Sequence, residues 1–284
     1  MIKKFVLIAI LFLCLFSCKT VDINKTLDIT LTTIQATEKA ARPISDEEEY
    51  YIGRAVAARM FLYYTLYENH ELTNYINSIG KVIALHSEKP FTFGGYHFAL
   101  LNSNEINAFA CPGGIVFLTK GMLKLAKSED ELAAIVAHEI AHVNHRDGIN
   151  SIKQARWTEA LTIIGTTAAK QYGDEDLLKL VNIFENSIDD ILKTLIVNGY
   201  SKTREYAADE KALQYLAKAG YNPYALLNVL ERLRQSTKSE GGILNTHPDT
   251  TDRINNLKDK IPVVSLDLNA FKKRTLRFNS FVKE

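Results

Sequence analysis

Residues 128–145 read SEDELAAIVAHEIAHVNH. Ser128 and Glu131 have the spacing of a capping box, in which each side chain satisfies a backbone N–H group at the start of a helix. Apolar residues follow with helical spacing, so we expect a helix that runs to about Arg146. Because its neighbours are apolar, the second half of this helix is expected to be buried.

Within this helix, His138, Glu139 and His142 form the pattern His-Glu-x-x-His. Residues four apart in an α-helix lie about 40° apart around the axis and about 6 Å apart along it, so both imidazoles can bind one metal ion. Glu139 lies about 100° further round the helix and can instead take a proton from a water molecule at the metal's open coordination position. This division of roles indicates zinc-dependent hydrolysis.

Two histidines leave a zinc site without its third protein ligand. His145 lies on the same face, but it is about 10 Å along the axis from His138. We therefore expect His145 at the surface or beside the site. A metzincin would need glycine at position 145 and histidine at position 148, where this chain has His145 and Gly148, so that class is excluded.

Two acidic residues, Glu205 and Asp209, lie in the segment SKTREYAAD, residues 201–209. They share one helix face, and the two alanines between them allow a neighbouring helix to pack closely. We expect Glu205 to bind zinc and Asp209 to accept a hydrogen bond from the far nitrogen of a ligand histidine. The alternative is a solvated, charged helix face, which would be preferred in the absence of the histidine motif.

The histidine motif followed by Glu205-x-x-x-Asp209 resembles the gluzincin zinc metallopeptidases related to HtpX, BepA and the CAAX prenyl protease. Residues 107–114, NAFACPGG, and residues 246–248, Thr-His-Pro, with Arg253 are similar to two further motifs of that family, in the same order. The resemblance covers about residues 45–260. It is closest to the periplasmic BepA-like branch, because the sequence predicts no membrane-spanning helices.

This resemblance implies a mostly helical, zincin-like α+β domain that binds one Zn2+ ion per chain. His138, His142 and Glu205 would be the zinc ligands, and Asp209 would orient a ligand histidine. Glu139 would act as the general base and then return the proton to the leaving amine. The expected chemistry is the hydrolysis of peptide bonds.

The resemblance also assigns roles to the other two motifs. The strand after Gly113-Gly114 would offer its edge to an extended peptide, and Asn107 lies in the segment before it; a plain turn is the alternative. His247 would approach the zinc ion and hold the enzyme latent, or would simply precede a helix. Cys111 could bind zinc as a thiolate, but we expect it to be a small buried residue.

The first eighteen residues indicate that the protein is exported from the cytoplasm. Lys3 and Lys4 precede twelve apolar residues, which is typical of a secretory signal. Leu15-Phe16-Ser17-Cys18 resembles a bacterial lipobox, so we expect a lipoprotein signal peptide over residues 1–17 and a lipid anchor at Cys18. A plain signal peptide with an incidental cysteine is the alternative. A tether over residues 18–44 would then lead from the membrane to the folded domain.

The whole-chain composition is that of an ordinary globular protein. The 284 residues are 46% hydrophobic, with 34 Lys and Arg against 33 Asp and Glu. This balance offers no electrostatic surface for nucleic acid, so no nucleic-acid partner is expected. Three cysteines are too few for a disulfide framework.

The rest of the sequence predicts helices around one small sheet. Ser45 and Glu48 form another capping box, which starts a helix that should reach about Glu68. Two β-rich runs, Tyr96–Leu101 and Ile115–Thr119, are separated by a polar loop and a Pro-Gly-Gly turn. A Gly-rich loop is expected over residues 239–249, and further helices near 71–87, 151–172, 175–198 and 200–219, from Asn222-Pro223 onward, and at 250–260.

The expected protein is a metallopeptidase domain over residues 45–260 with an unmatched C-terminal extension, 261–284. Its function would be zinc-dependent cleavage of unfolded or misassembled envelope proteins. It would be lipid-anchored in the bacterial cell envelope, at the outer membrane and facing the periplasm. The alternative is a zinc-binding latent protease that acts mainly as a chaperone or assembly factor. A third hypothesis is that the protein is a helical structural protein that binds no metal.

Overall fold

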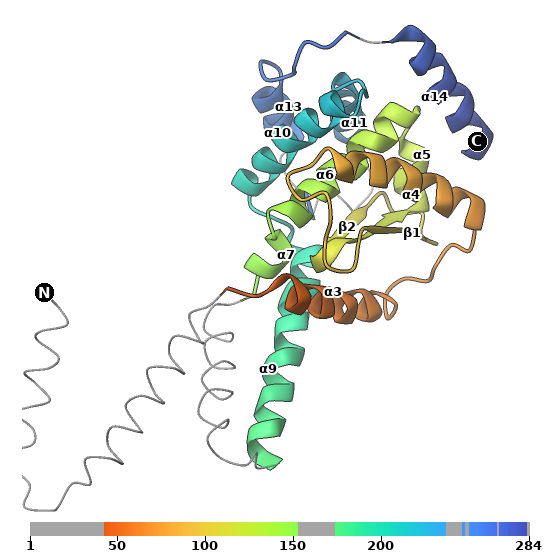
Figure 1. The fold of residues 1–284 in the computed structure, drawn as a ribbon. Helices are drawn as coiled ribbons and strands as arrows, with labels where there is room; N and C mark the ends of the chain where they lie inside the picture. Colours follow the sequence, from red (N-terminus) through yellow and green to blue (C-terminus); the bar gives the residue numbers. More distant parts are fainter. Residues whose placement is uncertain (1–42, 153–173, 237–245, 248–249, 266, 283–284) are drawn as a thin grey trace, which may run out of the picture. The chain divides into compact units, whose positions relative to one another are not determined.

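The computed structural model describes residues 43–152, 174–236, 246–247, 250–265 and 267–282 (Figure 1). The predicted signal peptide, Cys18 and the tether up to residue 42 lie outside these ranges. Nearly all of the helix predicted near 151–172 and most of the Gly-rich loop also lie outside them.

The chain divides into two compact units. One comprises residues 43–157 and 181–284, and it holds the sheet and every residue discussed below. The other comprises residues 1–42 and 158–180, of which only the start of one helix, from Asp174, is described. Among the described residues, no helix is both long enough and apolar enough to cross a membrane.

The sheet has three strands, β1 (His97–Leu101), β2 (Ala108–Cys111) and β3 (Ile115–Thr119). Their order is β1-β3-β2, with β1 parallel and β2 antiparallel to β3. The predicted α+β class and two of these strands are confirmed. The sequence did not predict β2, because all four of its residues are buried and show no alternation of apolar and polar side chains.

The strand that follows Gly113-Gly114 occupies the centre of the sheet. Since β3 pairs with β1 on one side and with β2 on the other, the expectation that it offers a free edge is wrong. The outer strand on this side is β2. The turn between β2 and β3 requires glycine, because Gly113 and Gly114 have φ angles of 74° and 101°.

Helices cover both faces of the sheet (Figure 1). Ala108 and Ala110 of β2 pack with α4 (His70–Leu85) and α6 (Glu129–Asn144) in the larger core. Phe109 and Cys111 face the opposite way, into a second core with α3 (Asp46–Met60) and part of α9 (Asp174–Lys193). Successive side chains of β2 thus point alternately into the two cores.

The helix α6 runs through the larger core and positions the site. Ser128 accepts a hydrogen bond from Glu131 N at 3.2 Å. The Glu131 carboxylate accepts from Lys127 N and pairs with Arg232, so only half of the predicted capping box forms. Every residue of α6 from Glu129 to Val143 is buried, and the helix ends at Asn144, close to the predicted end.

The remaining helices that the sequence predicts lie close to their predicted positions with two differences, and the short helices at 120–125 and 147–150 were not predicted. The first helix ends at Met60 and not near Glu68. The unmatched extension contains a helix, α14 (Leu268–Phe281), which contacts α4 and α6 and pairs Arg277 with Glu129. The other helices are α5 (Lys120–Leu125), α7 (Asp147–Asn150), α10 (Lys202–Lys218), α11 (Tyr224–Gln235) and α13 (Thr250–Leu257).

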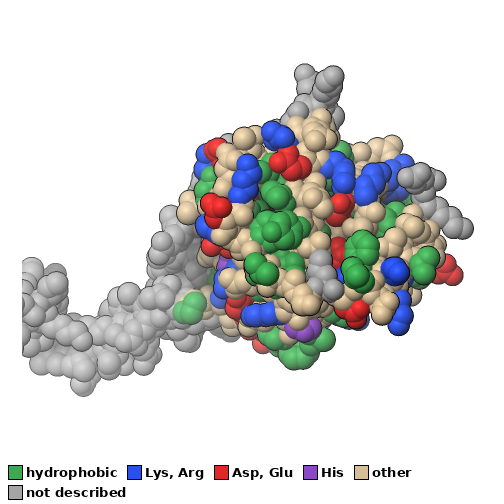
Figure 2. Space-filling model, turned by 90° about the horizontal axis from the view of Figure 1, so that it is seen from above, with side chains coloured by type: hydrophobic (Ala, Val, Ile, Leu, Met, Phe, Trp, Pro, Cys, Tyr) green, Lys and Arg blue, Asp and Glu red, His purple; other side chains and the backbone are tan. Residues whose placement is uncertain are grey.

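The outer surface carries charges of both signs. Figure 2 shows Lys and Arg interspersed with Asp and Glu on the face viewed, with exposed hydrophobic side chains between them. This pattern agrees with the nearly neutral net charge of the chain.

Candidate metal centre

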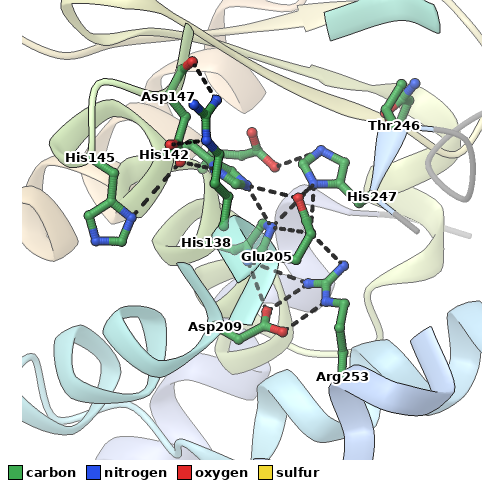
Figure 3. A network of polar contacts seen from close by, with 12 residues as sticks. His138, His142, His145, Asp147, Glu205, Asp209, Thr246, His247 and Arg253 are labelled. Atoms are coloured by element: carbon green, nitrogen blue, oxygen red, sulfur yellow. Dashed lines mark hydrogen bonds and ion pairs between the residues drawn. The ribbon is translucent and has the colours of Figure 1, made fainter. Parts of the chain in front are cut away.

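Three separate segments bring four potential metal ligands together. The helix α6 supplies His138 and His142, α10 supplies Glu205, and the segment before α13 supplies His247. One ligand atom from each lies within 4.8 Å of the other three, and all four side chains are buried (Figure 3). The predicted ligands therefore converge, and His247 joins them.

The inward-facing atoms of this cluster are closely spaced. The Nε2 atoms of His138 and His142 lie 3.1 Å apart. The Glu205 carboxylate lies 3.4 Å from each of these two nitrogens. His247 Nδ1 lies 3.0 Å from Glu205 Oε1 and 3.3 Å from His138 Nε2.

The outer nitrogen of His138 faces Asp209. Its Nδ1 lies 2.9 Å from Asp209 Oδ1, the contact that the sequence predicts. Arg253 donates through Nε and Nη2 to Asp209 and lies 2.9 Å from Glu205 Oε2 through Nη1. Burial alone would raise the pKa of Asp209, but the Arg253 guanidinium outweighs it and holds that pKa below its usual value.

The outer nitrogen of His142 faces Asp147, a contact that sequence reasoning missed. His142 Nδ1 lies 2.8 Å from the buried Asp147 Oδ2. Asp147 follows Arg146, whose φ angle of 56° turns the chain back at the end of α6. Burial alone would lower the pKa of His142, but its hydrogen bonds with Asp147 and Glu205 raise it to about 10. Figure 3 shows Asp147 and Asp209 on opposite sides of the cluster.

This donor set fits a cation. Because Asp147 and Asp209 accept the Nδ1–H groups, the Nε2 atoms of both histidines turn toward Glu205. At a separation of 3.1 Å, the two Nε2 atoms either share one proton in a hydrogen bond or repel each other, through their lone pairs when both are bare and through their charges when both are protonated. A metal ion held between them and the carboxylate removes this repulsion. Imidazole and carboxylate ligands of this kind suit zinc.

Glu139 lies beside the cluster but is not part of it. Its side chain is 1% exposed, and its Oε2 atom has no hydrogen-bond partner among the described residues. The nearest ion pair joins Oε1 to His247 Nε2 at 3.9 Å. An unpartnered buried carboxylate oxygen at this position is available to accept a proton.

Tyr200 is another neighbour that the sequence did not reveal. Its ring packs against the His142 imidazole, with centroids 4.4 Å apart, and its backbone N–H donates to Thr246 O at 3.2 Å. Thr246 Oγ1 in turn donates to Asn107 Oδ1, at the start of β2. Burial, together with nearby carboxylates, raises the pKa of Tyr200 well above its usual value.

The other candidates lie outside the cluster. His145 is partly exposed and lies 3.9 Å from Asp147 through Nδ1, as a residue beside the site would. Cys111 is a buried free cysteine whose pKa burial raises, and it is not among the four converging residues. Gly113 donates its N–H to Glu49 Oε1 and serves the turn.

Comparison with known proteins identifies relatives. The model of peptidase family M48 matches residues 68–261. The chain is 29% identical over 215 residues to the beta-barrel assembly-enhancing protease of Escherichia coli K12, covering 72% of this chain and 43% of that protein. It is 27% identical to a protease HtpX homolog of Salinibacter ruber, covering 56% of this chain and 66% of that protein.

A mitochondrial relative is similar over a shorter stretch. The chain is 31% identical over 159 residues to the metalloendopeptidase OMA1 of Schizosaccharomyces pombe, covering 55% of this chain and 44% of that protein. The chain thus spans less than half the length of the Escherichia coli protein that it matches. The family match covers the histidine motif on α6, the acidic pair on α10 and Arg253 on α13. The chain therefore belongs to peptidase family M48, a family of metallopeptidases.

Proposed function

We propose that this protein is a zinc-dependent endopeptidase. The observation that carries the proposal is the convergence of His138, His142 and Glu205, all buried, beside the unpartnered Oε2 of Glu139. The three converging side chains would hold one zinc ion. When bound, zinc supplies a Lewis acid that polarises a peptide carbonyl and acidifies water.

The protein's own residues divide the remaining work. Glu139 accepts the proton of the attacking water and returns it to the leaving amine. Asp209 and Asp147 fix the ring orientations of the two ligand histidines through their Nδ1–H groups. Arg253 balances the negative charge of Glu205 and Asp209 in the buried site.

An extended peptide would bind along β2. Among the described residues this strand pairs only with β3, so its outer edge is the place for an added strand. Asn107 lies at the start of this edge and contacts Thr246, which precedes His247. Backbone pairing of this kind gives affinity with little sequence selectivity, which suits unfolded substrates.

His247 would hold the enzyme latent. Its Nδ1 lies within hydrogen-bonding distance of Glu205 and His138, in the position of a fourth ligand. A catalytic zinc site keeps one position open for water or substrate, so an imidazole at this place blocks the reaction. Activity would then require His247 to move away.

The proposed setting is the bacterial cell envelope. The signal-like residues 1–17 and Cys18 support export and a lipid anchor at the outer membrane, facing the periplasm. The Escherichia coli relative is named for enhancing beta-barrel assembly, which supports misassembled envelope proteins as substrates. We propose no nucleic-acid partner and no cofactor besides zinc.

A second function deserves a test because His247 fills the site. The protein would then be a zinc-binding chaperone or assembly factor that rarely cleaves. Replacing Glu139 by Gln separates the two, since it removes the base and leaves the proposed zinc ligands in place. Endopeptidase function predicts that Glu139→Gln abolishes casein digestion and fails to rescue envelope assembly. Rescue by Glu139→Gln as complete as by the wild type would favour the chaperone.

A further inference from the structure

Tyr200 is held firmly against the site by its main chain and its ring. It follows a π-helical turn, Thr194–Asn198, and Gly199, whose φ angle is 69°. Its ring lies 4.4 Å from the His142 ring and 6.1 Å from the His247 ring, between centroids. The hydrogen bond from its N–H to Thr246 O fixes the backbone at the same place.

The hydroxyl of Tyr200 has no partner among the described residues, although it is buried. The other buried tyrosines of the described chain are satisfied. Tyr75 and Tyr221 donate to Glu129, Tyr96 donates to Lys89 O, and Tyr215 donates to Glu88. A buried hydroxyl without an acceptor lowers stability, so its retention beside a reactive site points to a functional partner.

A second unpartnered atom lies at the same site. Among the described residues, Glu139 Oε2 is a buried acceptor without a donor and Tyr200 is a buried donor without an acceptor. The two side chains do not satisfy each other, although burial and the nearby carboxylates of Asp147 and Glu139 raise the pKa of the phenol. A water molecule and a peptide carbonyl, the two reactants of hydrolysis, supply the missing donor and the missing acceptor.

We propose that Tyr200 is a catalytic hydrogen-bond donor, whose hydroxyl binds the carbonyl oxygen of the peptide bond being cleaved. The proton stays on Tyr200, and the hydrogen bond strengthens as negative charge develops on that oxygen. This inference rests on the proposed endopeptidase function. It explains why the hydroxyl is left without a partner in the protein alone.

The test compares Tyr200→Phe with Tyr221→Phe in the full-length protein. Removing one donor of this kind lowers kcat by about 100- to 1000-fold, with a smaller effect on KM. Tyr200→Phe should lower kcat to this extent. Its zinc content and Tm should stay at or above the wild-type values, because the hydroxyl makes no hydrogen bond to the described residues. Tyr221→Phe removes a hydroxyl that is bonded to Glu129, far along α6, so Tm should fall by about 2–4 °C with kcat unchanged.

Two results would overturn the inference. One is a Tyr200→Phe protein with wild-type kcat, and the other is one whose Tm falls as far as that of Tyr221→Phe. Glu139→Gln distinguishes failure of the endopeptidase function from failure of the proposed role of Tyr200. If cleavage is absent from both the wild type and the His247→Ala protein, or is unaffected by Glu139→Gln, the endopeptidase function itself fails, and the role of Tyr200 falls with it. If cleavage depends on Glu139 but not on Tyr200, only the present inference fails.

Discussion

The Nε2 atoms of His138 and His142 lie 3.1 Å apart, and the Nδ1 atom of each ring faces a buried carboxylate. The two rings are therefore oriented from outside, by Asp209 and Asp147, so that their inner nitrogens meet at Glu205. This arrangement holds the proposed metal ligands in place without a metal. It also makes each outer carboxylate a separate target for mutation.

Replacing Asp147 by Asn should weaken metal binding without unfolding the protein. The amide keeps the shape of the side chain but loses the charge that fixes the His142 ring, so zinc affinity should fall about 10- to 100-fold. Competition with a chelator measures this change. The control is Asp189→Asn, which alters an exposed pair with Arg59 and should leave affinity unchanged. Equal affinity in the wild type and Asp147→Asn would contradict the orienting role.

Metal affinity should rise with pH. In the metal-free protein the pKa of His138 is raised, and that of His142 is raised to about 10, so the His142 ring is protonated at neutral pH. Zinc requires a bare Nε2 atom and must displace the proton that His142 holds there. Calorimetry in buffers of different ionisation enthalpy should therefore detect proton release at pH 7. An affinity that is constant between pH 6 and pH 9 would show that the ring protons are absent.

The same raised pKa affects the stability of the metal-free protein. A histidine whose folded-state pKa exceeds its unfolded value stabilises the fold fully below the unfolded pKa and loses this contribution as pH rises toward the folded value. For His142 the window runs from about 6.5 to about 10. The Tm of the metal-free protein should fall across that window more than the Tm of the zinc-loaded protein.

Replacing Arg253 by Met should destabilise the metal-free protein strongly. Arg253 is 3% exposed and pairs with both Glu205 and Asp209, so its loss removes the guanidinium that faces both buried carboxylates. Breaking a buried pair of this kind costs about 3–5 kcal/mol of unfolding free energy. Urea unfolding should show a smaller loss with zinc present, because the metal compensates Glu205. The control Lys260→Met removes an exposed pair and should change stability by less than about 1 kcal/mol.

Replacing His247 by Ala should raise peptidase activity. The imidazole lies 3.0 Å from Glu205, in the position of a fourth ligand, and its removal opens that position. Zinc should still bind through the other three ligands, with lower affinity. Casein digestion and zinc titration check both effects, with the exposed His70→Ala as the control. A His247→Ala protein with unchanged activity and unchanged zinc affinity would end the latch hypothesis.

The sequence predicted the parts of the site that carry local signals. His138, Glu139 and His142 stand at helical spacing in a capped apolar segment, and Glu205 and Asp209 stand one turn apart. Asp147 escaped prediction because it follows a backbone reversal at Arg146, where helical periodicity no longer applies. Its contact with His142 depends on that turn.

Other features depend on packing between distant segments. The strand β2 is built from small, wholly buried residues, so its sequence lacks the alternation of a half-exposed strand. The proposed role of Tyr200 rests on its folded position beside His142 and on a hydroxyl that has no partner among the described residues. The helix α14 is tied to the start of α6 through Arg277 and Glu129, residues 148 positions apart. No local pattern encodes such contacts.

Zinc content measured together with casein cleavage decides whether this protein is a zinc-dependent peptidase. Wild-type protein purified without added metal should contain one zinc ion per chain and digest casein, more slowly than the His247→Ala protein. Glu139→Gln should retain the zinc and lose all digestion, and Glu205→Gln should lose both. A wild-type chain without bound metal, or a Glu139→Gln protein that still digests casein, would contradict the account.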